Sequence, residues 1–346
     1  NVHWVDVAAI GERLRELAPW QRVNHFPGMA GVARKARMAQ ALDRMRRAFP
    51  LDYRFYPRTW VLPSEACALR SEFDAAGRSA RTLIVKPDAG CQGKGIYLTQ
   101  ELDDRLLSMD SQVVQLYVRR PLLIDGYKFD LRVYVLVTSI RPLRVYAFRD
   151  GLARLCTSAY VRPAAANMGD RCMHLTNYAI NRRSDNFVAN ADAERDDTGS
   201  KRSLRWLLEW VGQTHGEARA RRMWRRMGQC AVKTLVPVLP QLHREYRATF
   251  GADGSRCIEV LGFDFMVDEA LKPWLIEVNH LPSFATDSPL DASIKVRRAE
   301  QTPRCVASTA PGRTTRCPLP QCRTCAKMRC IDETQALTRM GTEVSV

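Results

Sequence analysis

The sequence lacks long hydrophobic runs. No apolar stretch approaches the roughly 20 residues that a helix needs to cross a bilayer, and the N-terminus lacks the basic, apolar and small-residue order of a signal peptide. We therefore expect neither secretion nor a membrane partner. Internal repeats are also missing, as are RNA-binding signatures with interleaved aromatic and basic residues. We expect an ordinary globular fold and no nucleic-acid partner.

A pairing rhythm among the cysteines is missing as well. The chain has 11 cysteines, of which six are scattered among apolar or motif positions, as in a protein of the reducing cytosol: Cys67, Cys91, Cys156, Cys172, Cys230 and Cys257. The other five crowd the C-terminal tail at Cys305, Cys317, Cys322, Cys325 and Cys330. Their short gaps are compatible with a zinc site, but no histidine joins them, and the surrounding Pro, Thr and Arg are typical of an unstructured tail. Both interpretations stay open.

Acidic residues are in short supply relative to basic ones. The chain has 53 Lys and Arg against 37 Asp and Glu, a net charge of +16, and most of the excess lies in two segments. Residues 200–247 hold eleven basic residues against three acids, and residues 295–346 hold ten against four. The charge indicates an anionic partner, or simply a solvated basic face. At 346 residues the chain, which begins at Asn1 and reads as a fragment, is long enough for two or three lobes.

Two apolar runs near the C-terminal third of the chain contain acidic residues. If residues 262–268 and 274–280 pair as antiparallel strands about a short turn, Asp264 lies across from Glu277, and Glu277 and Asn279 share a face. Buried carboxylates need a cation or a hydrogen-bond donor. Hard oxygen ligands of this kind suit Mg²⁺, which leaves its other positions to water and phosphates. The alternative is a hairpin with a solvated acidic face.

A glycine-rich turn follows the predicted strand 82–86. Residues 86–96 read Lys-Pro-Asp-Ala-Gly-Cys-Gln-Gly-Lys-Gly-Ile, so bare backbone amides can approach a phosphate, with Lys94 adding a positive charge. The turn lacks the Lys-Ser/Thr ending of a Walker loop, and a strand-like run follows it. A hairpin flap over a nucleotide fits better.

Two further strands carry charge on one face. In the strand after the Asp125-Gly126 turn, Lys128, Asp130 and Arg132 alternate with apolar residues, and Arg154 is isolated among apolar neighbours and needs an anion. The apolar run at 113–118 predicts a buried strand, either a plain core strand or a wall for an adenine ring.

With these motifs on view, the chain resembles the tubulin tyrosine ligase-like family, in its polyglutamylase branch, within the ATP-grasp superfamily. The resemblance covers about residues 20–295 and is carried by the glycine flap, by the acidic hairpin and by the motifs Asn24–Met29, Phe55–Trp60, Asp125–Arg132, His174–Tyr178 and Glu277–Phe284. It implies an α+β ATP-grasp fold, in which antiparallel sheets form lobes that close over ATP, with flanking helices. The lobes are expected at 1–81, 82–125 and 126–295, followed by a basic, disordered tail at 296–346.

The resemblance also implies roles for individual residues. The metal ligands would be Asp264, Glu277 and Asn279. The phosphates would be met by Lys86, Gln92, Gly93, Lys94 and Gly95. The adenine would be lined by Gln115, Leu116, Tyr117 and Val118. The γ-phosphate and the acceptor would be surrounded by Lys128, Asp130, Arg132, Arg154 and Asn177. Selection of glutamate as the added amino acid would fall to Cys91, Gln92 and His280.

The implied function is a monomeric, ATP- and Mg²⁺-dependent ligase that joins free glutamate to glutamate side chains of tubulin C-terminal tails through an acyl phosphate. The expected partners are tubulin tails or microtubules, and the expected location is the cytoplasm and cytoskeleton, including the cilium, flagellum or basal body. The alternatives are a ligase of the same fold that adds glycine or tyrosine, a ligase for another acidic protein, and a non-enzymatic microtubule binder. Beyond about residue 295 the family pattern fades.

Overall fold

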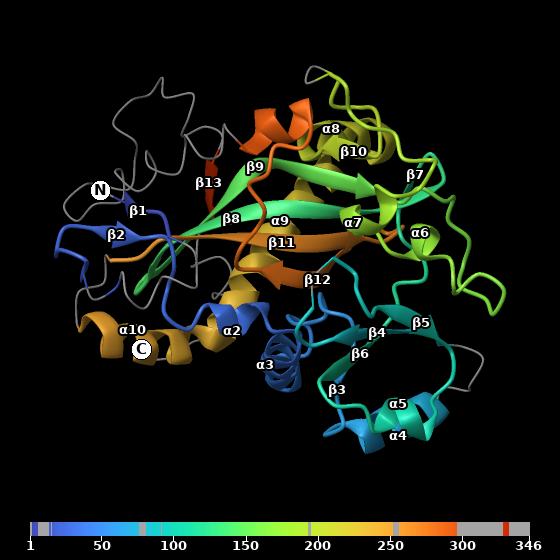
Figure 1. Ribbon diagram of the computed structural model, residues 1–346, viewed down its shortest axis with the longest axis horizontal. Helices are drawn as coiled ribbons and strands as arrows, with labels where there is room; N and C mark the ends of the chain where they lie inside the picture. Colours follow the sequence, from blue (N-terminus) through green and yellow to red (C-terminus); the bar gives the residue numbers. More distant parts are fainter. Residues whose placement is uncertain are drawn as a thin grey trace.

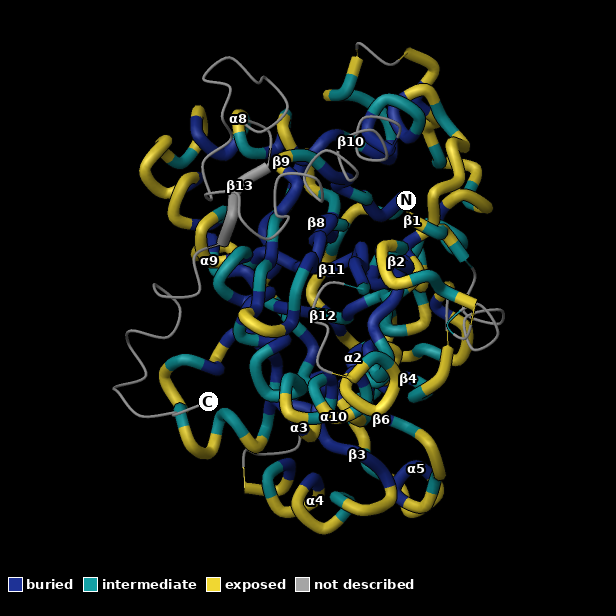
Figure 2. Tube along the Cα trace, turned by 90° about the vertical axis from the view of Figure 1, so that its left-hand side faces the viewer, coloured by how far each residue is buried: buried dark blue, intermediate teal, exposed yellow. Residues whose placement is uncertain are grey.

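The chain folds around two antiparallel sheets with flanking helices, which confirms the predicted α+β class with antiparallel sheets (Figure 1). The computed structural model describes residues 2–5, 14, 16–75, 81–90, 92–192, 195–251, 256–295 and 328–331. A small parallel pair, β1 (Val2–His3) with β2 (Arg22–Val23), lies at the N-terminal end. Figure 2 shows the strands of the large sheet as the buried centre of the molecule, with exposed residues at its periphery.

The large sheet has the strand order β10-β9-β8-β11-β12, with β7 paired to β8 and β13 paired to β9. Its strands are β7 (Leu123–Ile124), β8 (Tyr127–Ile140), β9 (Leu143–Leu155), β10 (Lys201–Ser203), β11 (Glu259–Val267), β12 (Pro273–Asn279) and β13 (Met328–Ile331). β8 and β9 form a long hairpin, and β11 and β12 form a second hairpin that adds to its edge. The segment 296–346, predicted to be disordered, thus supplies one strand of this sheet in its described part.

Helices cover one face of the large sheet. They are α8 (Leu204–His215), α9 (Glu217–Leu235), the 3₁₀ turn η3 (Val236–Val238) and α10 (Leu239–Phe250). The helical run breaks at Pro237 and Pro240, because proline cannot donate a backbone hydrogen bond. Phe129, Leu131 and Val133 of β8 are buried in the same core cluster as residues of α8 and α9. The alternation of β8 therefore turns Lys128, Asp130 and Arg132 to the other face.

The smaller sheet has the order β3-β6-β4-β5 and lies beside the open face of the larger one (Figure 1). Its strands and neighbouring helices are β3 (Thr59–Leu62), α4 (Ala66–Ala75), β4 (Leu83–Pro87), β5 (Tyr97–Thr99), α5 (Asp104–Leu107) and β6 (Gln112–Leu116). β4 and β5 pair antiparallel, as predicted for the flap. Because β3 pairs with β6, the proposed boundary at residue 82 falls inside this sheet.

Four further helices lie between strands. They are α2 (Ala30–Ala33) and α3 (Lys35–Ala48), between β2 and β3, and α6 (Arg171–His174) and α7 (Tyr178–Asn181), between β9 and β10. Arg34, between α2 and α3, is extended and serves as the N-cap of α3. Among the described cysteines, Cys67, Cys156, Cys172, Cys230 and Cys257 are free thiols. No helix in the described part of the chain is long and apolar enough to cross a membrane.

Candidate functional site

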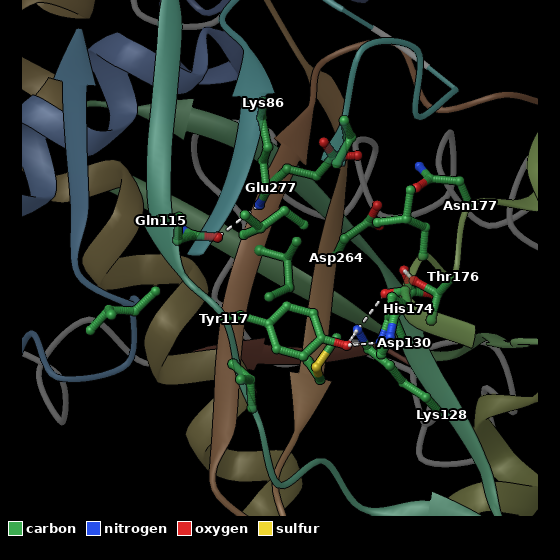
Figure 3. Close-up of a pocket in the computed structure, with 17 residues that line it drawn as sticks. Lys86, Gln115, Tyr117, Lys128, Asp130, His174, Thr176, Asn177, Asp264 and Glu277 are labelled. Carbon is green, nitrogen blue, oxygen red and sulfur yellow. Dashed lines mark hydrogen bonds between the residues drawn. The ribbon is translucent and has the colours of Figure 1, made fainter. Parts of the chain in front are cut away.

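A pocket opens between the two sheets. It encloses about 610 Å³, including its opening to solvent, and its labelled side chains come from both sheets and from the segment around α6 and α7 (Figure 3). Seventeen residues line it: Ile84, Lys86, Ile96, Gln115, Leu116, Tyr117, Val118, Lys128, Asp130, His174, Leu175, Thr176, Asn177, Asp264, Met266, Ile276 and Glu277. Charged groups and apolar side chains thus converge in one cavity, a combination typical of small-ligand sites.

The acidic hairpin has the predicted register. Asp264 of β11 is paired with Glu277 of β12, and Asn279 Nδ2 donates to Glu277 Oε1 at 3.3 Å, so Glu277 and Asn279 share a face. The pairing shifts between Asp264 and Phe265, which marks a β-bulge. The bulge brings both Ile276 and Glu277 to the pocket, whereas strict alternation would turn Ile276 away.

Two arginines hold Asp264 and Asp130. Arg132 donates to Asp264 through Nε and, at 2.9 Å, through Nη2, while Arg154 Nη2 donates to Asp264 Oδ2 at 2.9 Å. Arg154 also forms a bidentate pair with Asp130, at 2.7 and 2.6 Å. Thr176 Oγ1 completes the network with a 2.7 Å bond to Asp130 Oδ2. The anion that Arg154 was expected to need is therefore a pair of carboxylates on neighbouring strands.

The two carboxylates of the hairpin differ in their pKa. Burial alone would raise the pKa of Asp264, but the guanidinium groups of Arg132 and Arg154 outweigh it and hold this pKa well below its usual range. For Glu277, burial raises the pKa, and the nearby charge of Asp264 raises it further. No ion pair joins Glu277 to a cation within the described part of the chain. Glu277 is therefore a half-buried carboxylate without direct charge compensation.

Lys86 lies on the opposite wall, contributed by β4. Its Nζ donates to Gln115 Oε1 at 2.7 Å (Figure 3). Gln115 Nε2 in turn donates to Thr59 Oγ1 at 2.8 Å. Burial lowers the pKa of Lys86 to about 8, against the opposing influence of Glu277. This ammonium group is buried without an anionic partner in contact, so an anionic ligand would stabilise it.

Lys128 is the second buried lysine of the pocket. Its Nζ donates to Tyr117 Oη at 2.7 Å and to the backbone oxygen of His174 at 2.6 Å (Figure 3). Tyr117 Oη is also 3.1 Å from His174 Nδ1. Burial lowers the pKa of Lys128 to about 8, and the nearby Cys156 and Asp130 oppose this effect. These bonds hold Lys128 at the floor of the cavity.

The glycine-rich loop packs against the segment around α7. Gly93 has a φ of +74°, and a Cβ there would lie 2.6 Å from Ile180 Cδ1 and 3.0 Å from Asn177 Oδ1. The Gly93 carbonyl accepts a 2.8 Å bond from Arg171 Nη2. Only glycine combines this backbone with so close an approach. The flap is therefore fixed across the mouth of the pocket by contacts that the sequence did not reveal.

The predicted site residues fall into three groups. Ten line the pocket: Lys86, Gln115, Leu116, Tyr117, Val118, Lys128, Asp130, Asn177, Asp264 and Glu277. Three bond to those: Arg132, Arg154 and Asn279. The rest do not line it: Gln92, Gly93, Lys94 and Gly95 in the flap, and the half-buried His280 beyond β12. Cys91 lies outside the described residues.

Sequence reasoning missed several lining residues. These are Ile84, Ile96, His174, Leu175, Thr176, Met266 and Ile276. The polar motif His174–Tyr178 was the available signal for His174 and Thr176. The others are apolar and read as ordinary core residues.

The residues present fit a divalent cation. Glu277 lacks a cationic contact, Asn279 adds an amide oxygen on the same face, and Asp264 is kept ionised. Within the described residues, no three His, Cys, Asp or Glu side chains gather as a metal cluster, so such a site would use these two acids and the amide.

Comparisons with known proteins agree with this geometry. The model of the tubulin-tyrosine ligase family matches residues 12–312. The chain is 43% identical over 299 residues to tubulin polyglutamylase ttll6 of Danio rerio, which covers 85% of this chain and 37% of the relative. It is 43% identical over 297 residues to tubulin polyglutamylase TTLL6 of Homo sapiens, covering 85% and 32%, and 42% identical over 302 residues to TTLL13 of Mus musculus, covering 85% and 36%.

The chain spans between a quarter and somewhat over a third of the length of the curated relatives that it matches. The matched family model, by contrast, extends over most of this chain, including all residues that line the pocket between the sheets. The chain belongs to the tubulin-tyrosine ligase family.

Proposed function

We propose that this chain is the catalytic part of an ATP-dependent tubulin polyglutamylase of ATP-grasp type. The observation that carries the proposal is the pocket between the sheets, where two buried lysines face an acidic hairpin. A polyanion with a bound cation complements both walls. The names of its relatives support tubulin as the acceptor protein.

In this proposal Asp264, Glu277 and Asn279 hold Mg²⁺. When bound, Mg²⁺ supplies positive charge that neutralises the transferring phosphoryl group. Glu277 is suited to this role because its carboxylate is half-buried, has a raised pKa and contacts no lysine or arginine among the described residues. A divalent cation would remove the cost of that charge.

Other residues bind ATP. Lys86, Lys94 and the flap at Gln92, Gly93 and Gly95 meet the phosphates, with Asn177 beneath the flap. The backbone and side chains of β6 and the residues after it form the adenine wall: Gln115, Leu116, Tyr117 and Val118. Ile84, Ile96 and Met266 complete an apolar slot for the ring.

The reaction proceeds in two steps. An acceptor carboxylate oxygen attacks the γ-phosphorus of ATP, the bond to the β-phosphate oxygen breaks and ADP leaves, which gives an acyl phosphate. The amine of free glutamate then attacks the acyl carbon, phosphate leaves, the nitrogen loses a proton and an isopeptide bond remains. Arg132 and Arg154 stabilise the phosphoryl oxygens and the tetrahedral oxyanion, and Asp130 and Lys128 keep Arg154 and the acceptor oriented.

Cys91, Gln92 and His280 select glutamate as the added amino acid. Burial lowers the pKa of His280, and the charges of His25 and Arg34 lower it further. His280 is therefore a neutral imidazole near pH 7, and it would act on the substrate as a hydrogen-bond partner.

The test uses the purified chain with ATP, Mg²⁺ and tubulin, and with labelled glutamate, glycine and tyrosine in parallel. We expect ATP-dependent incorporation of glutamate alone, found by mass spectrometry on the acidic C-terminal tails. The variant Glu277→Gln is the matched control for the site. Incorporation of glycine or tyrosine instead, or no incorporation with intact ATP binding, would refute the proposal.

The proposal extends to cellular context. The chain acts as a monomer on tubulin tails or microtubules, with free glutamate as co-substrate, at the cytoskeleton, including cilia, flagella and basal bodies. The net charge of +16 supports an acidic partner of this kind.

A further inference from the structure

A second, larger cavity lies away from the pocket between the sheets. It is a groove of about 1190 Å³, including its opening to solvent, between α3 on one side and η3 with α10 on the other, with α2 at one end. Figures 1 and 2 both show α2, α3 and α10 as neighbours. Arg37, Gln40 and Arg44 line it from α3, and Gln241 and Arg244 line it from α10. Each set recurs at helical spacing, so two helix faces border one channel.

The three arginines of the groove have no acidic partner. Arg37, Arg44 and Arg244 are exposed, and none forms an ion pair with a carboxylate in the part of the chain that the structure describes. Other arginines of α3 behave differently, since Arg46 and Arg47 both pair with Asp43. The groove therefore concentrates uncompensated positive charge.

The polar side chains that line the groove are basic or neutral. No Asp or Glu of the described part of the chain lines it, and the two glutamines add neutral donors and acceptors. One carboxylate, Glu245, lies against Gly28 at the edge of the groove and accepts a 2.7 Å bond from Gln241 Nε2. With three arginines against this one acid at the edge, the groove favours an anion.

We propose that this groove, which we call the α3–α10 groove, binds an acidic, extended polypeptide segment. The inference rests on the proposed function, because it assigns this segment to the acceptor protein, next to the glutamate that is modified. Arg37 and Arg44 are seven residues apart on α3, which separates them by about 10 Å along the helix axis, and this spacing favours a chain of several residues over a single small anion.

The helix α3 connects the groove to the flap. Lys35 Nζ donates to the Gly90 carbonyl at 3.1 Å, and the Ala36 amide donates to Asp88 Oδ1 at 2.7 Å. The first turn of α3 is therefore hydrogen-bonded to the residues that follow β4, where the flap begins. The same helix presents Arg37 and Arg44 to the groove. A polypeptide held there lies on the element that supports the nucleotide loop.

The test compares two triple variants of equal net charge. The first, Arg37→Gln with Arg44→Gln and Arg244→Gln, removes the charge of the groove. The control, Arg219→Gln with Arg222→Gln and Arg225→Gln, removes exposed arginines of α9. Both must retain the melting temperature of the parent chain. Fluorescence anisotropy with a synthetic glutamate-rich peptide measures binding.

We expect the groove variant to bind this peptide about tenfold more weakly, because three exposed ion pairs are lost together, and the control to change little. With an acidic protein acceptor, KM for the acceptor should rise by about the same factor, while kcat and KM for ATP stay constant. Equal loss in both variants, or unchanged binding in the groove variant, overturns the inference. The inference is also overturned if a DNA oligonucleotide of matched charge binds the parent chain as tightly as the peptide and its affinity falls by the same factor in the groove variant. The groove would then be a general polyanion site.

The inference and the proposed function fail separately. If the parent chain ligates no glutamate, the proposed function fails, but the peptide measurement still decides whether the groove binds an acidic polypeptide. If the parent chain ligates glutamate and the groove variant keeps its acceptor KM, the groove is refuted and the proposed function stands.

Discussion

The buried lysines of the pocket give a quantitative prediction about nucleotide binding. Burial lowers the pKa of both Lys86 and Lys128 to about 8, from a usual value of 10.5. Because each pH unit corresponds to about 1.4 kcal/mol, holding either lysine charged costs the unliganded protein ~3 kcal/mol. This cost is fully present below about pH 8 and is lost as the pH rises toward 10.5. The free energy of unfolding should therefore increase over that range.

Nucleotide phosphates reverse this balance. Their negative charge favours the ammonium form and raises both pKa values, so protons are taken up on binding wherever the free lysines are partly neutral. Near pH 8 each lysine is about half protonated, and binding should take up close to one proton in total. Near pH 6 each is ~99% protonated already, and uptake through the lysines should be close to zero.

The assay is isothermal titration calorimetry of ATP with Mg²⁺ in two buffers of different ionisation enthalpy, whose difference in heat counts the protons. The variant Lys86→Met should reduce the uptake near pH 8 to about half of the parent value. Lys272→Met is the control, because Lys272 lies over the Trp274 ring and outside the pocket. Absence of uptake near pH 8, or uptake that does not fall toward pH 6, would refute the reasoning.

Three further predictions concern single residues of the site. Because burial and Asp264 raise the pKa of Glu277, its ionised form destabilises the fold at neutral pH. The variant Glu277→Gln should therefore keep or raise the melting temperature measured by calorimetry, while its rate of glutamate ligation should fall by at least about a hundredfold. Gly93→Ala forces a Cβ to within 2.6 Å of Ile180 at a positive φ, so it should cost roughly 1 kcal/mol or more of stability in a denaturant titration and raise KM for ATP; an unaltered KM would contradict the packing of the flap. Arg154→Lys loses the bidentate pair with Asp130, and steady-state kinetics should show kcat reduced about a hundredfold with KM for ATP nearly unchanged.

Much of the site follows from the sequence because it depends on local alternation. The pairing of Asp264 with Glu277, the shared face of Glu277 and Asn279 and the charged face of β8 all result from the period of two in a strand. The exposure of Ile276 to the pocket could not be predicted in this way, because it depends on a β-bulge that shifts the alternation by one residue.

Contacts that use the main chain were equally invisible in the sequence. The His174 carbonyl fixes Lys128, and the Gly93 carbonyl fixes Arg171, but any residue type carries a carbonyl. The sequence indicated that Arg154 needs an anion without identifying which one. The structure supplies two, and their identity depends on the order of β9, β8 and β11 in the sheet.

The hydrogen bonds of the two arginines leave room for a cation at Asp264. The same carboxylate accepts three guanidinium hydrogen bonds and is the proposed ligand for Mg²⁺. A carboxylate has about four lone-pair positions, and Oδ2 uses two of its own while Oδ1 uses one, so one position on Oδ1 remains for a cation. The arginines keep Asp264 ionised, which a ligand requires, and they neutralise Asp130 and Asp264 but leave Glu277 uncompensated. In the proposed site, Glu277 would therefore provide most of the electrostatic attraction for a cation, and Asp264 would provide a fixed oxygen beside it.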